Sequence, residues 1–124
     1  MRAVTTATAA VALGMRRKAL DNLLGRIDLP AVTPGRQGVE RRIPVALLPE
    51  LFLTAELVGE LSISVRSAFA LARRLGQGMA PIGPFLQVMV DTAAIQREID
   101  RRLEVAIETV VRRPRGRPRM SPGP

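Results

Sequence analysis

Five arginines stand close together near the end of the chain: Arg112, Arg113, Arg115, Arg117 and Arg119. A guanidinium group presents its donors in a rigid fork that matches phosphate oxygens, so this run offers recognition of a polyanion. Pro114 and Pro118 favour an extended backbone and remove N–H donors that a helix or a strand needs. Gly116 lets the main chain approach another surface closely. Such an arm fits a narrow minor groove, where negative potential attracts arginine.

The stretch from Arg113 to Arg119 resembles the AT-hook of high-mobility-group chromatin proteins, whose centre is an arginine-glycine-arginine-proline run with basic flanks. The resemblance covers this segment alone and ends at Met120, where that family usually continues with a basic residue. A solvated tail that binds any polyanion weakly is the alternative interpretation. The resemblance implies DNA binding in which two arginines enter the minor groove and the other arginines contact phosphates. The residues that it implies for this contact are Arg112, Arg113, Arg115, Gly116, Arg117, Pro118 and Arg119.

The residues that most catalytic and metal sites need are missing from this sequence. The chain contains no His, Cys, Trp or Tyr, which excludes zinc fingers, thiol nucleophiles and imidazole bases. Glu56 and Glu60 lie one helical turn apart, but the matching acids and histidines of a di-metal helical site are absent. We therefore expect a non-enzymatic protein with no metal site and no cofactor.

Positive charge is concentrated at the two ends of the chain. The net charge is +8, and residues 1–44 and 112–124 each contribute +5. Residues 45–111 contribute −2. We expect the middle to fold or self-associate, while the ends contact a polyanion or an anionic membrane surface.

The segment from Thr8 to Ile27 has the periodicity of one basic amphipathic helix, with a cluster of cations at residues 16–18. Three interpretations remain open for this helix: a packed helix with a solvated face, a helix on a membrane surface or on phosphates, and a targeting presequence. Prolines and glycines after Asp28 predict a linker that continues to Pro44. A strand over residues 39–45 would have no obvious partner.

Two long helices are predicted in the middle of the chain. Apolar residues recur at spacings of three and four over residues 45–75, but Glu56, Glu60 and Arg66 make a transmembrane span too costly. Residues 76–84 break the pattern, and Pro84 is expected to open a second helix over residues 85–113 that includes an ion pair from Glu98 to Arg102. The apolar surface of this pair exceeds what one partner helix covers, which predicts a homo-oligomer.

The sequence thus predicts an all-α fold: a long antiparallel helical hairpin with an additional N-terminal amphipathic helix and a disordered basic C-terminal tail. Residues 1–44 form the basic helix and linker, 45–111 the self-associating hairpin, and 112–124 the AT-hook-like tail. We expect a cytoplasmic protein that binds A·T-rich duplex DNA. The alternatives are a coat or adaptor on a lipid, storage-granule or membrane surface, similar in architecture to phasins, and an accessory subunit of a larger assembly. Within the cytoplasm, we expect the protein at the nucleoid or on the surface of an internal lipid body.

Changing Arg115 and Arg117 together to alanine is expected to abolish any preference for an A·T-rich duplex, because these residues flank Gly116 and would enter the groove. Arg112→Ala or Arg119→Ala is expected to weaken binding to A·T-rich and G·C-rich duplexes alike, and to reduce the salt dependence by about one charge. Fluorescence anisotropy titrations at several salt concentrations measure both effects. Unchanged affinity after removal of residues 112–124 would contradict a DNA-binding arm.

Overall fold

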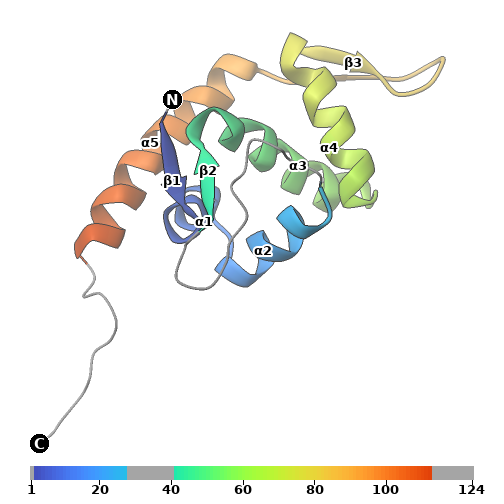
Figure 1. Ribbon diagram of the computed structural model, residues 1–124. Helices are drawn as coiled ribbons and strands as arrows, with labels where there is room; N and C mark the ends of the chain where they lie inside the picture. Colours follow the sequence, from blue (N-terminus) through green and yellow to red (C-terminus); the bar gives the residue numbers. More distant parts are fainter. Residues whose placement is uncertain (1, 28–40, 113–124) are drawn as a thin grey trace, which may run out of the picture.

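The computed structural model describes residues 2–27 and 41–112 (Figure 1). Helices account for 68% of the interpretable residues, so the mostly helical prediction is confirmed, but two small antiparallel sheets are also present. The elements in chain order are β1 (Ala3–Thr5), α1 (Thr6–Leu13), α2 (Arg17–Gly25), β2 (Arg42–Pro44), the 3-10 turn η1 (Val45–Leu47), α3 (Leu48–Leu61), α4 (Val65–Arg74), the 3-10 turn η2 (Leu75–Gln77), β3 (Met79–Pro81), β4 (Gln87–Met89) and α5 (Thr92–Arg112).

The predicted single helix over residues 8–27 is wrong, because a three-residue turn divides it into α1 and α2. Gly14 ends α1 in the left-handed conformation, with φ of 71°, and its N–H group bonds to carbonyls of the last turn. Arg16 is extended and precedes the first residue of α2. At the other end of α1, the Thr5 hydroxyl accepts a hydrogen bond from the N–H of Thr8 at 3.3 Å.

The strand near residue 43 does have a partner, which the sequence analysis missed. β1 and β2 pair antiparallel with Val4 opposite Ile43, and both side chains are buried. The N–H of Val45 also donates to the carbonyl of Arg2 at 3.0 Å. β1 carries little sequence signal because it has three residues and runs directly into α1. The pairing holds the start of the chain against the entrance to α3.

The predicted helix over residues 45–75 is also divided, at Ser62 to Ser64. Ser62 has a positive φ of 54°, and its N–H bonds to the carbonyl of Val58 at 3.0 Å. The Ser64 hydroxyl accepts from the N–H of Ser67 at 3.1 Å and caps α4. Serine side chains compete with the helix for backbone hydrogen bonds, and here they favour a turn.

Residues 76–84 were expected to be a simple break between helices, but they include the first strand of a β-hairpin and part of its connection. β3 and β4 pair antiparallel with Ala80 opposite Val88, and Pro84 lies in their connection instead of opening a helix. The carboxylate of Asp91 accepts from the N–H of Ala94 at 2.9 Å, so α5 begins at Thr92. The predicted long helical hairpin is thus replaced by shorter helices and a sheet.

The buried residues form two apolar clusters that meet along α3. The first joins α1, α2, α3 and α5 with β1, β2 and Phe69 of α4, and its fully buried side chains include Leu20, Ile43, Leu48, Leu51 and Ile99. The second joins α3, α4 and the β-hairpin around Leu57, Ala68, Leu71, Leu75 and Ala80. Alanines on the buried side of α1 allow α5 to lie close beside it (Figure 1).

Arg102 of α5 connects three elements at the α1–α2 turn. Its Nε donates to Glu98 at 2.7 Å, which confirms the predicted ion pair, and its guanidinium lies 5.2 Å from the ring centre of Phe52 on α3. Its Nη1 lies 3.3 Å from the position that a Cβ on Gly14 would occupy. Glu98 also accepts from Arg101 at 2.6 Å.

Gly14→Ala is expected to lower the free energy of unfolding by about 1–2 kcal/mol, because an L-residue is strained in the left-handed conformation. The new Cβ would also press against Arg102. Gly25→Ala is the matched control, since Gly25 has no positive φ and no atom within 4 Å of a built Cβ. Urea denaturation followed by circular dichroism measures both variants. Equal losses would contradict a special role for the turn.

Glu98→Gln is expected to lower the melting temperature at neutral pH and to have no such effect near pH 2. Hydrogen bonds from Arg101 and Arg102 lower the pKa of Glu98 from 4.5 to about 2. Because the pKa is lower in the folded state, the stabilisation is present above pH 4.5 and is lost as the pH falls toward 2. Glu104→Gln, at an exposed position of the same helix, is the control. A pH-independent difference between Glu98→Gln and the wild type would contradict the assignment.

Candidate nucleic-acid interface

α1, the turn and α2 have the connectivity of a helix-turn-helix. Two short helices joined by three or four residues that often include glycine define this motif, and Gly14 to Arg16 supply that turn. Leu20 and Leu24 of α2 are buried in the first apolar cluster, with exposed fractions of 0% and 6%. This packing fixes which face of α2 is directed outward.

The outward face of α2 is basic and polar. Lys18 and Asn22 are exposed and one helical turn apart, so their side chains are neighbours on the face opposite Leu20. Asparagine forms paired hydrogen bonds with adenine, and lysine donates to guanine, in the major groove of DNA. Arg16 and Arg26, both exposed, stand at the two ends of the helix. The face therefore combines side chains of the types that can read bases with side chains of the types that can bind phosphates.

The segment that enters β2 brings two more arginines to this unit. Arg42 is exposed and lies opposite Thr5 in the strand register, next to the start of α1. Arg41 Nη1 lies 3.7 Å from Asp21 Oδ1 on α2. That nitrogen is buried and has no hydrogen-bond partner among the described residues. Because this guanidinium nitrogen already lies beside the Asp21 carboxylate, Arg41 connects the segment that enters β2 to α2.

Charge is divided sharply between the two parts of the described chain. Residues 2–27 and 41–44 carry seven basic side chains and one acidic side chain. Residues 45–112 carry seven basic and eight acidic side chains. Within the described residues, the excess of positive charge therefore belongs to α1, α2 and the strands that pair beside them.

α3 and α4 also form two helices joined by a three-residue turn, but two of the three arginines of α4, Arg73 and Arg74, are engaged within the fold. Arg73 pairs with Glu50 at 3.3 Å and lies 4.9 Å from the ring centre of Phe69. Arg74 donates to the carbonyl oxygen of Pro81 at 2.7 Å. These contacts favour a structural role for α4 and leave α2 as the candidate DNA-reading helix.

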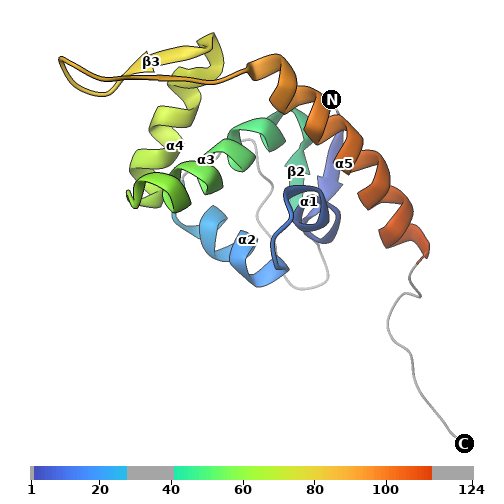
Figure 2. The same cartoon turned by 180° about the vertical axis from the view of Figure 1, so that it is seen from behind.

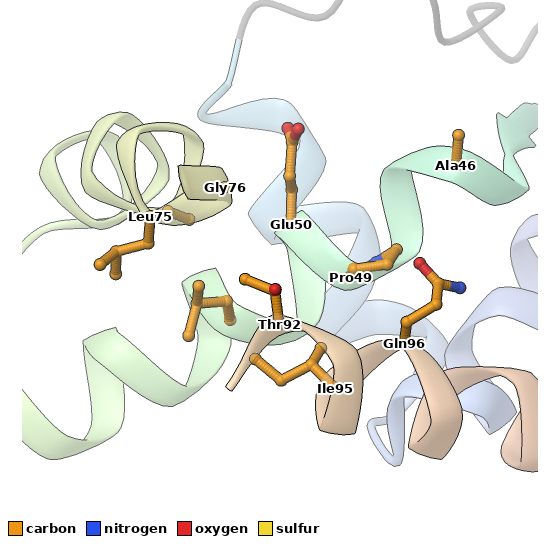
Figure 3. A pocket seen from close by; sticks show the side chains of 10 residues that line it. Ala46, Pro49, Glu50, Leu75, Gly76, Thr92, Ile95 and Gln96 are labelled. Atoms are coloured by element: carbon orange, nitrogen blue, oxygen red, sulfur yellow. The ribbon is translucent and has the colours of Figure 1, made fainter. Parts of the chain in front are cut away.

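A pocket of about 190 Å³ lies where α3, η2 and the start of α5 meet (Figure 3). Figure 3 shows the carboxylate of Glu50 directed away from Thr92 and Ile95, and this carboxylate is already paired with Arg73. Ligand pockets usually measure about 300–1,000 Å³. The pocket is lined by Ala46, Pro49, Glu50, Leu53, Ala72, Leu75, Gly76, Thr92, Ile95 and Gln96. Its size and its paired carboxylate give no sign of a ligand.

The residues predicted as a site from the sequence lie at or beyond the end of α5. Arg112 is the last residue of that helix, and Arg113 to Arg119 lie outside the described residues, so the AT-hook remains a prediction. Within residues 2–27 and 41–112, no group of acidic side chains is arranged to hold a metal ion. No helix in those ranges combines the length and apolar character needed to cross a bilayer.

The comparison of this chain with protein-family models, with curated proteins and with solved structures finds no match. The candidate interface therefore depends on the geometry of its own residues. The cationic cluster at residues 16–18 was visible in the sequence as a phosphate-contacting helix, one of three interpretations. The missed signal was Gly14, two residues before that cluster, which marks the turn between α1 and α2.

Proposed function

We propose that this protein binds double-stranded DNA and places α2 in the major groove. The observation that carries the proposal is the exposed basic and polar face of α2, positioned by the Gly14 turn. In a helix-turn-helix, the second helix contacts base edges through its N-terminal residues, while the first helix crosses the backbone. Lys18, near the start of α2, occupies such a position.

Each exposed residue of the interface has a distinct proposed role. Asn22 and Lys18 contact base edges and supply sequence preference. Arg16, Arg26 and Arg42 contact phosphates and supply affinity that depends on salt. These residues come from α2, its flanks and β2, so the antiparallel sheet helps to hold the set together.

The C-terminal arm is proposed as an additional DNA contact that follows α5. Arg115 and Arg117 would enter an A·T-rich minor groove, with Arg112, Arg113 and Arg119 on phosphates. An arm of this kind adds affinity to a separate sequence-reading helix, as N-terminal arms do beside major-groove helices. We propose no catalytic role for any residue of the chain.

Burial of the apolar faces favours DNA over a lipid surface. A coat protein needs an exposed apolar helix face that enters the boundary between headgroups and acyl chains. In α1 and α2 the residues that would form this face, including Leu13, Leu20 and Leu24, are buried in the first cluster. The exposed face of α2 is the polar one, which suits a groove lined by phosphates.

Lys18→Ala and Asn22→Ala are expected to relax sequence preference at individual base pairs, each by about 1–3 kcal/mol of discrimination. Selection of duplexes from a random library with the wild-type protein identifies the preferred sequence, and anisotropy titrations compare the variants on it. Arg26→Ala is expected to weaken binding to every duplex and to reduce the salt slope by about one charge.

Arg66→Ala is the matched control, because Arg66 is an exposed arginine at the start of α4, the corresponding helix of the second pair. It is expected to leave both affinity and preference unchanged. A loss with Arg66→Ala that equals the loss with Arg26→Ala would move the interface to α4. No enrichment of any sequence by the wild-type protein would refute base reading by α2.

A further inference from the structure

The β-hairpin of β3 and β4 carries the three most exposed large apolar side chains of the described residues, together with the exposed Met79. The exposed fractions are 93% for Phe85, 76% for Met89, 63% for Leu86 and 48% for Met79. Phe85 and Leu86 lie in the connection between the strands, and the two methionines lie on the strands. Such clusters on soluble domains usually mark an interaction site. We call these four residues the hairpin patch.

The two faces of the hairpin have different surroundings. Ala80 and Val88 pair across the strands and pack in the second apolar cluster. Met79 and Met89 form the neighbouring pair, so their side chains lie together on the opposite face. The hairpin is held in place by the bond from Arg74 to the carbonyl of Pro81 at 2.7 Å. The patch is therefore presented by a segment anchored to α4.

The hairpin patch lies within the longest stretch of the fold without charge. Residues 75–90 contain no acidic or basic side chain, although the chain carries a net charge of +8. Two copies of the chain repel each other wherever their basic faces approach, and this repulsion is smallest at a neutral surface. The stretch also lacks the cations that bind phosphates of DNA or headgroups of anionic lipids. A second copy, which brings the same apolar and uncharged patch, is the occupant that fits this surface.

The area of the patch is adequate for a small dimer interface. An aromatic side chain buries about 150–250 Å², so Phe85 from two copies would bury about 300–500 Å². A standard interface buries about 1,600 Å², and this one residue would supply roughly a fifth to a third of it. The two methionines and Leu86 of each copy add to that area. Methionine also adapts its shape to an opposing surface.

We propose that two copies of this chain associate through their hairpin patches in a two-fold symmetric dimer. In a symmetric dimer the same patch contributes from both copies, as a self-complementary apolar surface requires. Both views of the fold place the hairpin far from α2, with α3 and α4 between them (Figures 1 and 2). The dimer therefore leaves both copies of α2 free. The inference goes beyond DNA binding, because the exposure and charge of the hairpin do not depend on what α2 binds.

Analytical ultracentrifugation of the full chain over a range of concentrations tests the dimer. The wild type is expected to sediment as a concentration-dependent dimer, and Phe85→Asp combined with Leu86→Asp is expected to sediment as a monomer. Val105→Asp is the matched control, since Val105 is 51% exposed on α5 and outside the patch, and it is expected to remain dimeric. Both altered patch positions are exposed, so the circular dichroism spectrum is expected to stay unchanged.

Three outcomes would overturn the proposal: a wild type that is monomeric at every concentration, a double variant that remains dimeric, or a Val105→Asp variant that is monomeric as well. Flotation with neutral and anionic vesicles provides another measurement. Binding of the monomeric wild type to vesicles that is lost in the double variant would assign the patch to lipid instead.

The dimer and the DNA interface can fail separately. Lys18→Ala with Asn22→Ala is expected to remain dimeric while it loses sequence preference. On a duplex with a single preferred half-site, the double variant of the hairpin is expected to bind as tightly as the wild type does. On a duplex with two suitably spaced half-sites, the wild type is expected to gain affinity and the double variant is expected to lose that gain. This last expectation rests on the proposed function, whereas sedimentation tests the dimer without DNA.

Discussion

The contact of α5 with the turn between α1 and α2 sets the position of the basic face. Without it, α1 and α2 are two short helices of eight and nine residues, which are marginal in isolation. Arg102 reaches the turn from α5 and at the same time covers Phe52 of α3. Gly14 makes the contact feasible, because it both adopts the left-handed conformation and leaves space for the guanidinium. The DNA-reading geometry therefore depends on a residue that touches no DNA in the proposed complex.

Sequence periodicity identified which residues are helical better than it identified where helices end. All of α5 lies within the helix predicted over residues 85–113, and its Glu98 to Arg102 pair was predicted too, because apolar and charged residues recur there with a helical period. Only the start of that helix was placed too early, before Thr92. The breaks at Gly14 and Ser62 were missed. Periodicity reports which face is buried, whereas a turn is decided by one left-handed residue and a few local hydrogen bonds. The same limit hid β1, whose pairing joins segments that are far apart in the chain.

The candidate interface was only half visible in the sequence. The residue types at positions 16–18 indicated contact with phosphates, and this followed from charge alone. The position of Lys18 and Asn22 on a helix that follows a turn could be seen only in the three-dimensional arrangement. A single long helix would have put the same residues beside a different surface. Similarly, an unpaired apolar face was expected over residues 45–111, but most of it is covered inside the fold. The part of this apolar surface that stays exposed is the hairpin patch. The prediction of two long helices could not locate it, because its residues lie in a β-hairpin.

α3 is shared by both apolar clusters, with Leu48 and Leu51 in the first and Leu57 in the second. A ligand that binds only the folded state raises the free energy of opening of every region whose unfolding destroys its site. DNA on α2 would therefore protect the backbone amides of the elements that form the first cluster, including α4 through Phe69. It would protect the β-hairpin only as far as the second cluster unfolds together with the first. Local unfolding at the hairpin end can then continue in the bound protein. α3 and α4, which contribute to both clusters, thus determine whether the two ends of the molecule act as one thermodynamic unit or as two.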